Sequence, residues 1–303
     1  MLKLQTELDY KVTQDKNTVY SHFTAKDCLE MFEKLYRMSD SELIEELPTN
    51  GSVLIEKRNG SYGTMFGKGN SFSGITAEEL IEWNNGKNID LKPFLEEKKK
   101  LGELSRKLKE KLAPIGKARR RRLSETDGEW DLDRKWDLKP FLATEKQNNS
   151  ILPTIRVDID FCFSGGHDSS AISRFGAFCW AIFSEIEEAG ITCEVNLLQY
   201  CERAFLTSYK KMFQTQTLKK AGEYIDSASL ARCFTSGHYR RAAFVAEVYT
   251  AECAGVRVSP GLGCPIPQPT ESEPGKLRLS ISNQTLQIDS LLKKVLQAIG
   301  AGE

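Results

Sequence analysis

A turn rich in glycine and hydroxyl residues carries the clearest chemistry in the sequence. It reads Ser164-Gly165-Gly166-His167-Asp168-Ser169 and follows a run of β-branched and aromatic residues. Glycine lets backbone N–H groups approach phosphate oxygens closely, and a helix that begins after such a turn adds positive potential. Phosphate contacts at Ser164, Gly165, Gly166, Asp168 and Ser169 are therefore one of two incompatible interpretations of this turn, and a metal site is the other.

Two polar residues of the turn also have simpler interpretations. His167 has the side chain of a general base, but the turn supplies no orienting partner, which favours a solvent-facing turn position. Asp168 is well placed to cap the next helix, a contact that contributes about 1 kcal/mol. We therefore assign neither residue to catalysis.

The turn lies inside the pattern of a βαβ unit. Residues 155–163 predict a buried strand, Arg174 to Glu188 an amphipathic helix, and residues 193–198 a second strand parallel to the first. Beyond them we expect a further strand or an edge hairpin at 207–216, strands at 256–258 and 277–281, a short helix that starts with Asp226-x-x-Ser229-Leu230-Ala231, and helices at 238–253 and 286–299. This order predicts an α/β fold with a doubly wound, Rossmann-like open sheet, whose ligands bind at the carboxyl ends of the strands.

The expected helix at 238–253 has one apolar face. We expect the apolar side chains to point inward and the charged ones outward. The inward set is Phe244, Val245, Val248 and Tyr249, and the outward set is Arg240, Arg241 and Glu247.

Several segments resemble von Willebrand factor A domains. Asp160-x-Cys162-x-Ser164, followed by a helix and a strand, is similar to the first half of such a domain. Other matching strings are Arg119 to Asp133, Phe175-Gly176-Ala177, Glu187-x-Ala189-Gly190-Ile191 and Arg240-Arg241-x-x-Phe244, which look like a phage and actinobacterial group of von Willebrand A-like proteins. The resemblance implies a von Willebrand A-type open sheet behind a variable N-terminal α+β region, a phage origin and no established activity.

The same resemblance implies a metal site. Its motif Asp-x-Ser-x-Ser holds a divalent cation through a carboxylate and two hydroxyls, which are ligands that Mg²⁺ prefers. Here the ligands would be Asp160, Ser164 and a threonine, Thr235 or alternatively Thr207. Cys162 replaces the first serine, and a neutral thiol is a poor ligand for Mg²⁺. A further aspartate, expected after the strand at 256–258, is missing from Ser259-Pro260-Gly261, so the resemblance implies a degenerate site.

Residues 164–169 also resemble the pyrophosphate loop of the ATP pyrophosphatases. That resemblance covers six residues and implies ATP as the substrate. Enzymes of this kind normally have further basic residues after later strands. Here the segment after Leu198 offers Arg203 and the Lys210/Lys211 pair.

A basic segment separates the two halves of the chain. Residues 98–122 contain 12 Lys and Arg against two Glu, and an acidic stretch follows. The leucines at 101, 104, 108 and 112 predict a helix that ends before Pro114. One interpretation is a nucleic-acid arm in which Lys117, Arg119, Arg120, Arg121 and Arg122 contact phosphates, and the other is pairing with acids of the same chain.

Composition bounds the remaining possibilities. The chain has 303 residues and no formal net charge, which is typical of a soluble globular protein. We expect three units, an N-terminal α+β region at 1–97, the charged connecting segment at 98–150 and the von Willebrand A-like domain at 151–303. No signal peptide or spanning apolar run is evident, and the eight cysteines have no metal-type spacing. These features favour reduced cysteines and a cytoplasmic location, the host cytoplasm for a phage protein.

The sequence therefore predicts a non-enzymatic, von Willebrand A-like binding protein that acts through protein contacts. Nucleic-acid binding through residues 98–122 and an ATP-pyrophosphatase activity are the alternatives. Mg²⁺ is the one cofactor that the resemblance implies. The sequence leaves open nucleic acid as a second partner and the oligomeric state.

Overall fold

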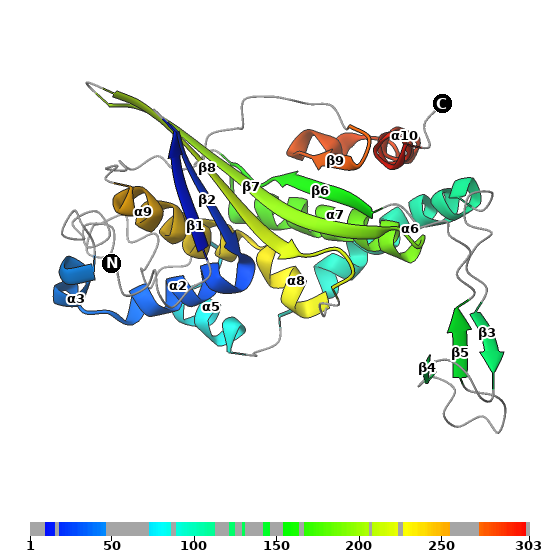
Figure 1. Cartoon of the computed structure of the whole chain (residues 1–303), viewed down its shortest axis with the longest axis horizontal. Coiled ribbons are helices and arrows are strands. Elements are labelled where there is room, and N and C mark those ends of the chain that lie inside the picture. Colours follow the sequence, from blue (N-terminus) through cyan, green and yellow to red (C-terminus); the bar gives the residue numbers. More distant parts are fainter. Residues whose placement is uncertain are drawn as a thin grey trace.

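The structure, a computed structural model, describes residues 10–15, 18–46, 73–85, 89–112, 121–124, 129–130, 142–145, 154–163, 167–205, 208–223, 227–254 and 273–300. Its centre is a six-stranded sheet with the order β1-β2-β8-β7-β6-β9 (Figure 1). The strands are β1 (Tyr10–Asp15), β2 (Thr18–Thr24), β6 (Thr154–Asp160), β7 (Thr192–Phe205), β8 (Ser208–Lys219) and β9 (Lys276–Leu279). Helices connect and cover these strands, so the predicted α/β class with a Rossmann-like open sheet is confirmed.

The predicted βαβ unit forms the middle of this sheet. β6 pairs in parallel with β7, and α7 (Ser169–Glu188) connects them. The rings of Phe161 and Phe163 lie 6.1 and 5.7 Å from the ring of Phe175 on α7. Apolar side chains at alternate positions after Ile155 therefore hold the helix against the sheet, as the sequence pattern requires.

The strand order contains a topological switch point. Along the chain, β6 is the first strand of this part, β7 the second, β8 the third and β9 the fourth. Across the sheet they lie in the order third, second, first, fourth, and β8 runs antiparallel to β7. This is the order of a doubly wound sheet, in which ligands bind where the order reverses. Here that point lies between the carboxyl ends of β6 and β9, beside Asp160 and Ser280.

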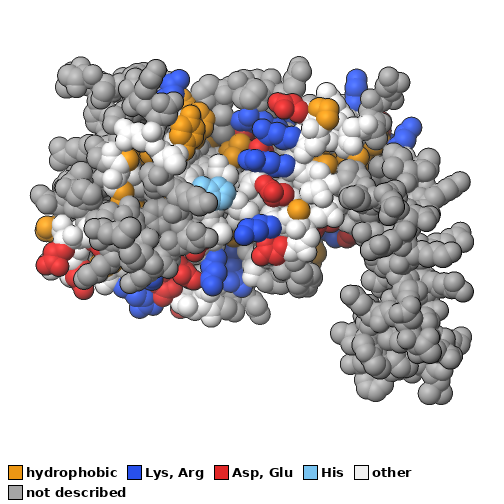
Figure 2. Space-filling model, in the orientation of Figure 1, with side chains coloured by type: hydrophobic (Ala, Val, Ile, Leu, Met, Phe, Trp, Pro, Cys, Tyr) orange, Lys and Arg blue, Asp and Glu red, His pale blue; other side chains and the backbone are white. Residues whose placement is uncertain are grey.

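The strands present one face to helices and another with many charged side chains. In Figure 1, α7 and α9 (Phe244–Cys253) lie behind the strands, and α8 (Ser227–Cys233) lies below their lower ends. Figure 2, in the same orientation, shows Lys and Arg side chains alternating with Asp and Glu side chains across the middle of the molecule. On β6 and β9, Arg156 is exposed and Asp160 and Lys276 are half-buried, whereas Asp158 and Arg278 are buried.

The N-terminal region extends the same sheet. β2 pairs in parallel with β8, and β1 adds an antiparallel edge. Apolar residues at helical spacing in 25–38 predict one helix here, and the capping-box spacings Ser39/Glu42 and Thr76/Glu79 predict two more. The structure has these helices as α2 (Ala25–Arg37), α3 (Asp40–Glu46) and α5 (Ala77–Asn84), with both capping boxes formed. Strands from both sides of residue 150, where we expect a unit boundary, therefore lie in one sheet.

The basic segment begins as a long helix, α6 (Lys92–Leu112). Leu101, Leu104 and Leu108 are buried, which confirms the predicted apolar stripe. Phe94 packs edge-on against Trp180 of α7, with the ring centroids 5.8 Å apart. The C-terminal helix α10 (Ile288–Ile299) follows η3 (Ile281–Thr285), and an ion pair of 2.6 Å between Lys107 and Asp289 joins it to α6.

A second, small sheet follows α6. It has the order β3-β5-β4 and consists of β3 (Arg121–Ser124), β4 (Glu129–Trp130) and β5 (Leu142–Glu145). The sequence did not predict these strands. Its charged and hydroxyl residues lack the alternation of a half-buried strand.

The predicted faces of the helix at 238–253 are wrong for the charged residues. Arg240, Arg241 and Glu247 are all buried, together with the apolar residues of the segment. The π-helix η2 (His238–Ala243) precedes α9, and every residue from 238 to 251 is buried. The segment is therefore enclosed on every face, so the polar face that the pattern predicts is not exposed to solvent.

Other expectations fall on residues that the structure does not describe. They are a hairpin at 53–66, which Asn59-Gly60 between two strand-like runs predicts, the strand at 256–258, and most of a second copy, at 137–142, of the phrase Asp90-Leu91-Lys92-Pro93-Phe94-Leu95. No helix among the described residues is long and apolar enough to cross a membrane. Cys28, Cys179, Cys193 and Cys233 are buried free thiols, as expected.

Candidate functional site

Asp160 and Arg278 form an ion pair at the switch point of the sheet. Arg278 Nε lies 2.9 and 3.0 Å from the two carboxylate oxygens of Asp160, and Nη2 lies 2.7 Å from Oδ1. The Arg278 side chain is 9% exposed and that of Asp160 is 20% exposed. Burial raises the pKa of Asp160 above its ordinary value, while the guanidinium acts in the opposite direction. The carboxylate is therefore already neutralised by a cation of the protein itself.

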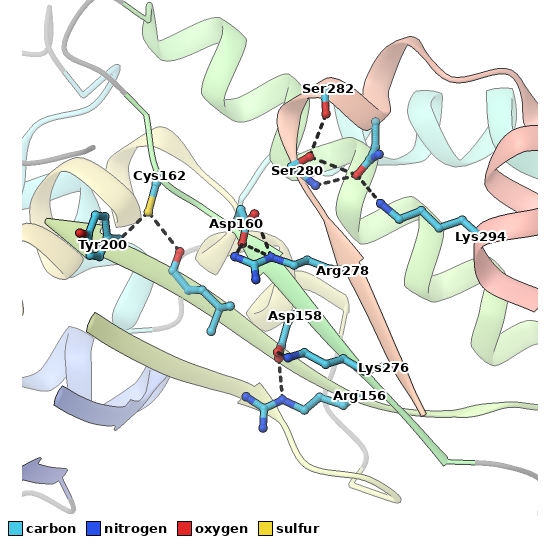
Figure 3. A network of polar contacts seen from close by, with 12 residues as sticks. Arg156, Asp158, Asp160, Cys162, Tyr200, Lys276, Arg278, Ser280, Ser282 and Lys294 are labelled. Carbon is cyan, nitrogen blue, oxygen red and sulfur yellow. Dashed lines mark hydrogen bonds and ion pairs between the residues drawn. The ribbon is translucent and has the colours of Figure 1, made fainter. Parts of the chain in front are cut away.

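A second aspartate, two residues earlier on β6, is also held in ion pairs. Asp158 is 2% exposed in its side chain, and its oxygens lie 2.6 Å from Arg156 Nε and 3.3 Å from Lys276 Nζ. Asn196 of β7 donates to it over 3.4 Å. Figure 3 shows these side chains in a row from β6 to β9. The row holds both buried carboxylates in ion pairs, which removes the desolvation cost of an isolated charge.

Lys294 reaches the same end of the sheet from α10. Its Nζ lies 3.2 Å from Asn283 Oδ1, which also accepts a hydrogen bond of 2.7 Å from Ser280 N–H. The hydroxyls of Ser280 and Ser282 are 2.9 Å apart beside it (Figure 3). Burial lowers the pKa of Lys294, and the charge of Asp160 partly offsets this effect.

Cys162 extends the pairing of β6 with β7 beyond the end of the strand. Its sulfur accepts a hydrogen bond of 2.9 Å from Tyr200 N–H and lies 3.5 Å from the carbonyl oxygen of Leu198 (Figure 3). The thiol thus replaces a backbone partner in the ladder, and the sulfur faces β7. This role explains a sulfur at the position where the resemblance places a hydroxyl ligand.

The metal site implied by the resemblance does not fit this arrangement. Asp160 is paired with Arg278, and Ser164 lies outside the described residues. The hydroxyl of Thr235 donates to the carbonyl of Arg232 over 2.8 Å and accepts from the N–H of His238 over 3.1 Å, so it serves a local turn. Thr207 is not described. Within the described ranges no group of three His, Cys, Asp or Glu side chains could hold a metal ion.

The predicted phosphate turn is only partly described. Ser164, Gly165 and Gly166 lie outside the described residues, so their role stays a prediction. Asp168 caps α7 by accepting from Ala171 N–H over 2.5 Å and from the hydroxyl of Ser170 over 2.8 Å. These contacts lower the pKa of Asp168 and place a carboxylate at the helix N-terminus, where a phosphate would otherwise be favoured.

A glycine contact brings two distant parts of the sequence to this helix terminus. Gly74 has φ +80°, a conformation that side chains rarely adopt, and a Cβ there would lie 3.2 Å from Ser169 Cβ. Arg240 donates a short hydrogen bond to the carbonyl oxygen of His167. The ring of His167 lies 5.6 Å from that of Phe163. The residues around the turn are thus fixed by packing and backbone contacts.

Sequence reasoning missed a buried polar cluster between β7, β8 and η2. Gln199 Oε1 accepts from Gln214 over 2.6 Å and from Gln216 over 3.1 Å, and Gln216 pairs with His238 Nε2 over 2.8 Å. Burial lowers the pKa of His238 to about 4. Residues 213–217 of β8 are polar at nearly every position, so alternation gives no signal of which side chains are buried.

With the fold and these contacts in place, a comparison with known families is informative. A family model, described as a domain of unknown function (DUF7192), matches residues 16–301. The chain belongs to this family. No curated protein and no solved structure shows a significant match. The DUF7192 match runs from just before β2 to the end of α10, so it includes Asp160, Arg278 and Lys294.

Some lysines of the basic segment, residues 98–122 of this DUF7192 chain, form ion pairs with acids of the same chain. Lys98 pairs with Glu188 of α7, and Lys107 lies 3.2 Å from Glu103 and 2.6 Å from Asp289 of α10. Of the predicted nucleic-acid residues, Lys117, Arg119 and Arg120 are not described, and Arg121 and Arg122 belong to β3 without described side chains. Nucleic-acid binding by Lys117 to Arg122 therefore stays a prediction.

Proposed function

We propose that the protein is a non-enzymatic, von Willebrand A-like binding protein of phage origin that acts through protein contacts and needs no divalent metal. The ion pair between Asp160 and Arg278 carries this proposal. A guanidinium whose Nε and Nη2 lie 2.7–3.0 Å from the carboxylate oxygens competes with any cation for the same oxygens. The binding surface would then be a fixed network of protein charges.

The proposal also accounts for the absence of an assigned catalytic residue. At the switch point, Asp158 and Asp160 are held in ion pairs, Cys162 supports the ladder and Asp168 caps a helix. General acid–base or nucleophilic catalysis needs a group that can exchange protons with a substrate. These four groups are engaged in holding the fold, which supports binding over turnover.

The experiment measures thermal unfolding of the full chain with Mg²⁺, Mn²⁺ or Ca²⁺, because a ligand of the native state raises the melting temperature. Cys162→Ser restores the pattern Asp-x-Ser-x-Ser, and we expect no stabilisation by metal as long as Arg278 is present. The matched variant is Cys162→Ser with Arg278→Ala, which frees Asp160. A metal-dependent rise in the wild type that is lost in Asp160→Asn would disprove the proposal, as would cleavage of ATP to AMP and pyrophosphate.

A further inference from the structure

The described network at the switch point has more cationic than acidic side chains. The cations are Arg156, Lys276, Arg278 and Lys294, and the acids are Asp158, Asp160 and Glu194. Asp158 forms ion pairs with Arg156 and Lys276, and Asp160 forms one with Arg278. Lys294 is the cation left without an acid within 4.0 Å among the described residues.

The surroundings of Lys294 satisfy its ammonium group incompletely. The side chain is half-buried, and its hydrogen-bond partner in the described part of the chain is the amide oxygen of Asn283. An ammonium group has three donors, and a partly buried charge without a counter-charge is costly. Arg278 adds positive potential next to it. The described residues therefore do not fully compensate the positive charge of Lys294, and this position favours the binding of an anion.

Two hydroxyls complete a set of donors on the same side. Ser280 Oγ and Ser282 Oγ lie 2.9 Å apart, and Ser280 is tied to Asn283, the residue that Lys294 contacts. Ser282 is exposed, whereas Ser280 and Lys294 are half-buried, so the set is open to solvent. In Figure 3 these side chains gather above the Asp160–Arg278 pair, at the carboxyl end of β9. Ligands of open α/β sheets bind at this location.

We propose that Lys294, Ser280 and Ser282 bind a phosphate-type oxyanion, with Arg278 supplying additional positive potential. An ammonium and two hydroxyls approach from different directions, which suits a tetrahedral anion with several oxygens better than a planar carboxylate. The inference deepens the proposed function and rests on its metal-free ion pair, because the guanidinium on Asp160 removes the charge that would repel the anion. It concerns residues outside the turn at 164–169.

The experiment titrates the full chain with inorganic phosphate in the presence of EDTA at constant ionic strength. Calorimetry and ³¹P NMR measure the binding. We expect saturable binding that Lys294→Met weakens about tenfold or more, since a hydrogen bond to a charged group contributes roughly 1.5–3 kcal/mol. Ser282→Ala should weaken it less. The matched control is Lys293→Met, which removes an exposed neighbouring ammonium on α10 and should leave the affinity unchanged.

Three outcomes would overturn the inference. They are the absence of saturable phosphate binding by the wild type, an unchanged affinity in Lys294→Met, and binding of acetate as tight as that of phosphate. Lys294→Arg, which keeps the charge, covers the case in which Lys294→Met does not fold, and it should retain binding. The presence of EDTA separates this test from the metal titration, because phosphate binding can fail while the metal-free ion pair stands.

Discussion

Arg241, which is fully buried, donates from Nε to the hydroxyl of Ser73 over 2.8 Å and to the carbonyl oxygen of Ile75 over 3.0 Å. The two partners are 168 and 166 residues away in the sequence. Beside this contact, Gly237 faces Ile75 so closely that a Cβ would lie 2.3 Å from Ile75 Cδ1. The buried guanidinium of Arg241 thus joins residues 73–75 to the π-helix, in addition to the pairing of β2 with β8.

Replacing this arginine should destabilise the whole chain. In Arg241→Met the hydroxyl of Ser73, which itself donates to the carbonyl of Ile75 over 2.5 Å, loses the guanidinium as its donor, so we expect the free energy of unfolding to fall by about 2–4 kcal/mol. Urea denaturation measures the change. Arg174→Met, which alters an exposed arginine of α7, should stay within about 0.5 kcal/mol of the wild type. Equal stabilities of the two variants would contradict the anchoring role.

Two helical glycines should respond in opposite directions to the same substitution. A Cβ at Gly176 of α7 would lie 1.8 Å from the carbonyl oxygen of Phe234, whereas a Cβ at Gly102 of α6 meets nothing within 4 Å. We expect Gly176→Ala to cost about 3 kcal/mol through overpacking and Gly102→Ala to add about 0.5–1 kcal/mol through helix propensity. Thermal unfolding of the pair tests the predicted packing of α7 on residue 234.

The elements that follow hydrophobic periodicity were predictable from the sequence. The βαβ unit, the capping boxes and the stripe of α6 obey local rules of pattern and capping, so Ile155, Thr76 and Leu104 lie where those rules place them. The antiparallel pairing of β7 with β8 was not predicted, because β8 alternates little in polarity and the sequence leaves open a strand or an edge hairpin at 207–216. Local pattern thus fixes the elements that bury an apolar face.

The candidate site was predictable only in its location. Asp160 stands at the end of a predicted strand, but its partner Arg278 lies 118 residues later, and pairing across that distance depends on the placement of β9 beside β6. The burial of Arg241 depends on other elements enclosing residues 238–251 on every face, whereas the sequence of this segment has the pattern of a helix with one polar face. Long-range ion pairs and irregular turns are decided by tertiary contacts that one sequence does not display.

The sulfur of Cys162 should be replaceable by a hydroxyl and not by a methyl group. Cys162→Ala leaves the N–H of Tyr200 without its acceptor, which should lower the free energy of unfolding by about 1–2 kcal/mol. Cys162→Ser keeps an acceptor at this position and should recover at least half of that loss. Chemical denaturation of the two variants decides the point. A serine variant as unstable as the alanine variant would argue against a role of the sulfur in the ladder.

The nucleic-acid alternative makes a separable prediction. If residues 119–122 contact phosphates, replacing all four arginines by alanine should weaken binding to single-stranded and duplex DNA and reduce the dependence of the affinity on salt. Lys98→Ala and Lys107→Ala remove cations that are paired with Glu188 and Asp289, so they should leave binding unchanged. Fluorescence anisotropy at low salt measures both. Failure of the wild type to bind either DNA would reject the alternative.

His238 should make the protein sensitive to mild acid. Its ring is fully buried and neutral, Nε2 donates to Gln216, and Nδ1 has no hydrogen-bond partner among the described residues. Because the folded state holds the pKa at about 4 and the unfolded chain near 6.5, the unfolded chain takes up a proton first as the pH falls. Stability is therefore lost between about pH 6.5 and pH 4, by about 3 kcal/mol.

The substitution His238→Gln isolates this contribution from the titration of carboxylates. Glutamine can still donate to Gln216 but takes up no proton, so the difference in unfolding free energy between variant and wild type should change by about 3 kcal/mol across that pH range. Denaturation at several pH values measures it. His22→Gln, at an exposed position of β2, is the control and should follow the wild-type profile. Parallel profiles for His238→Gln and the wild type would show that the buried ring does not titrate as its burial requires.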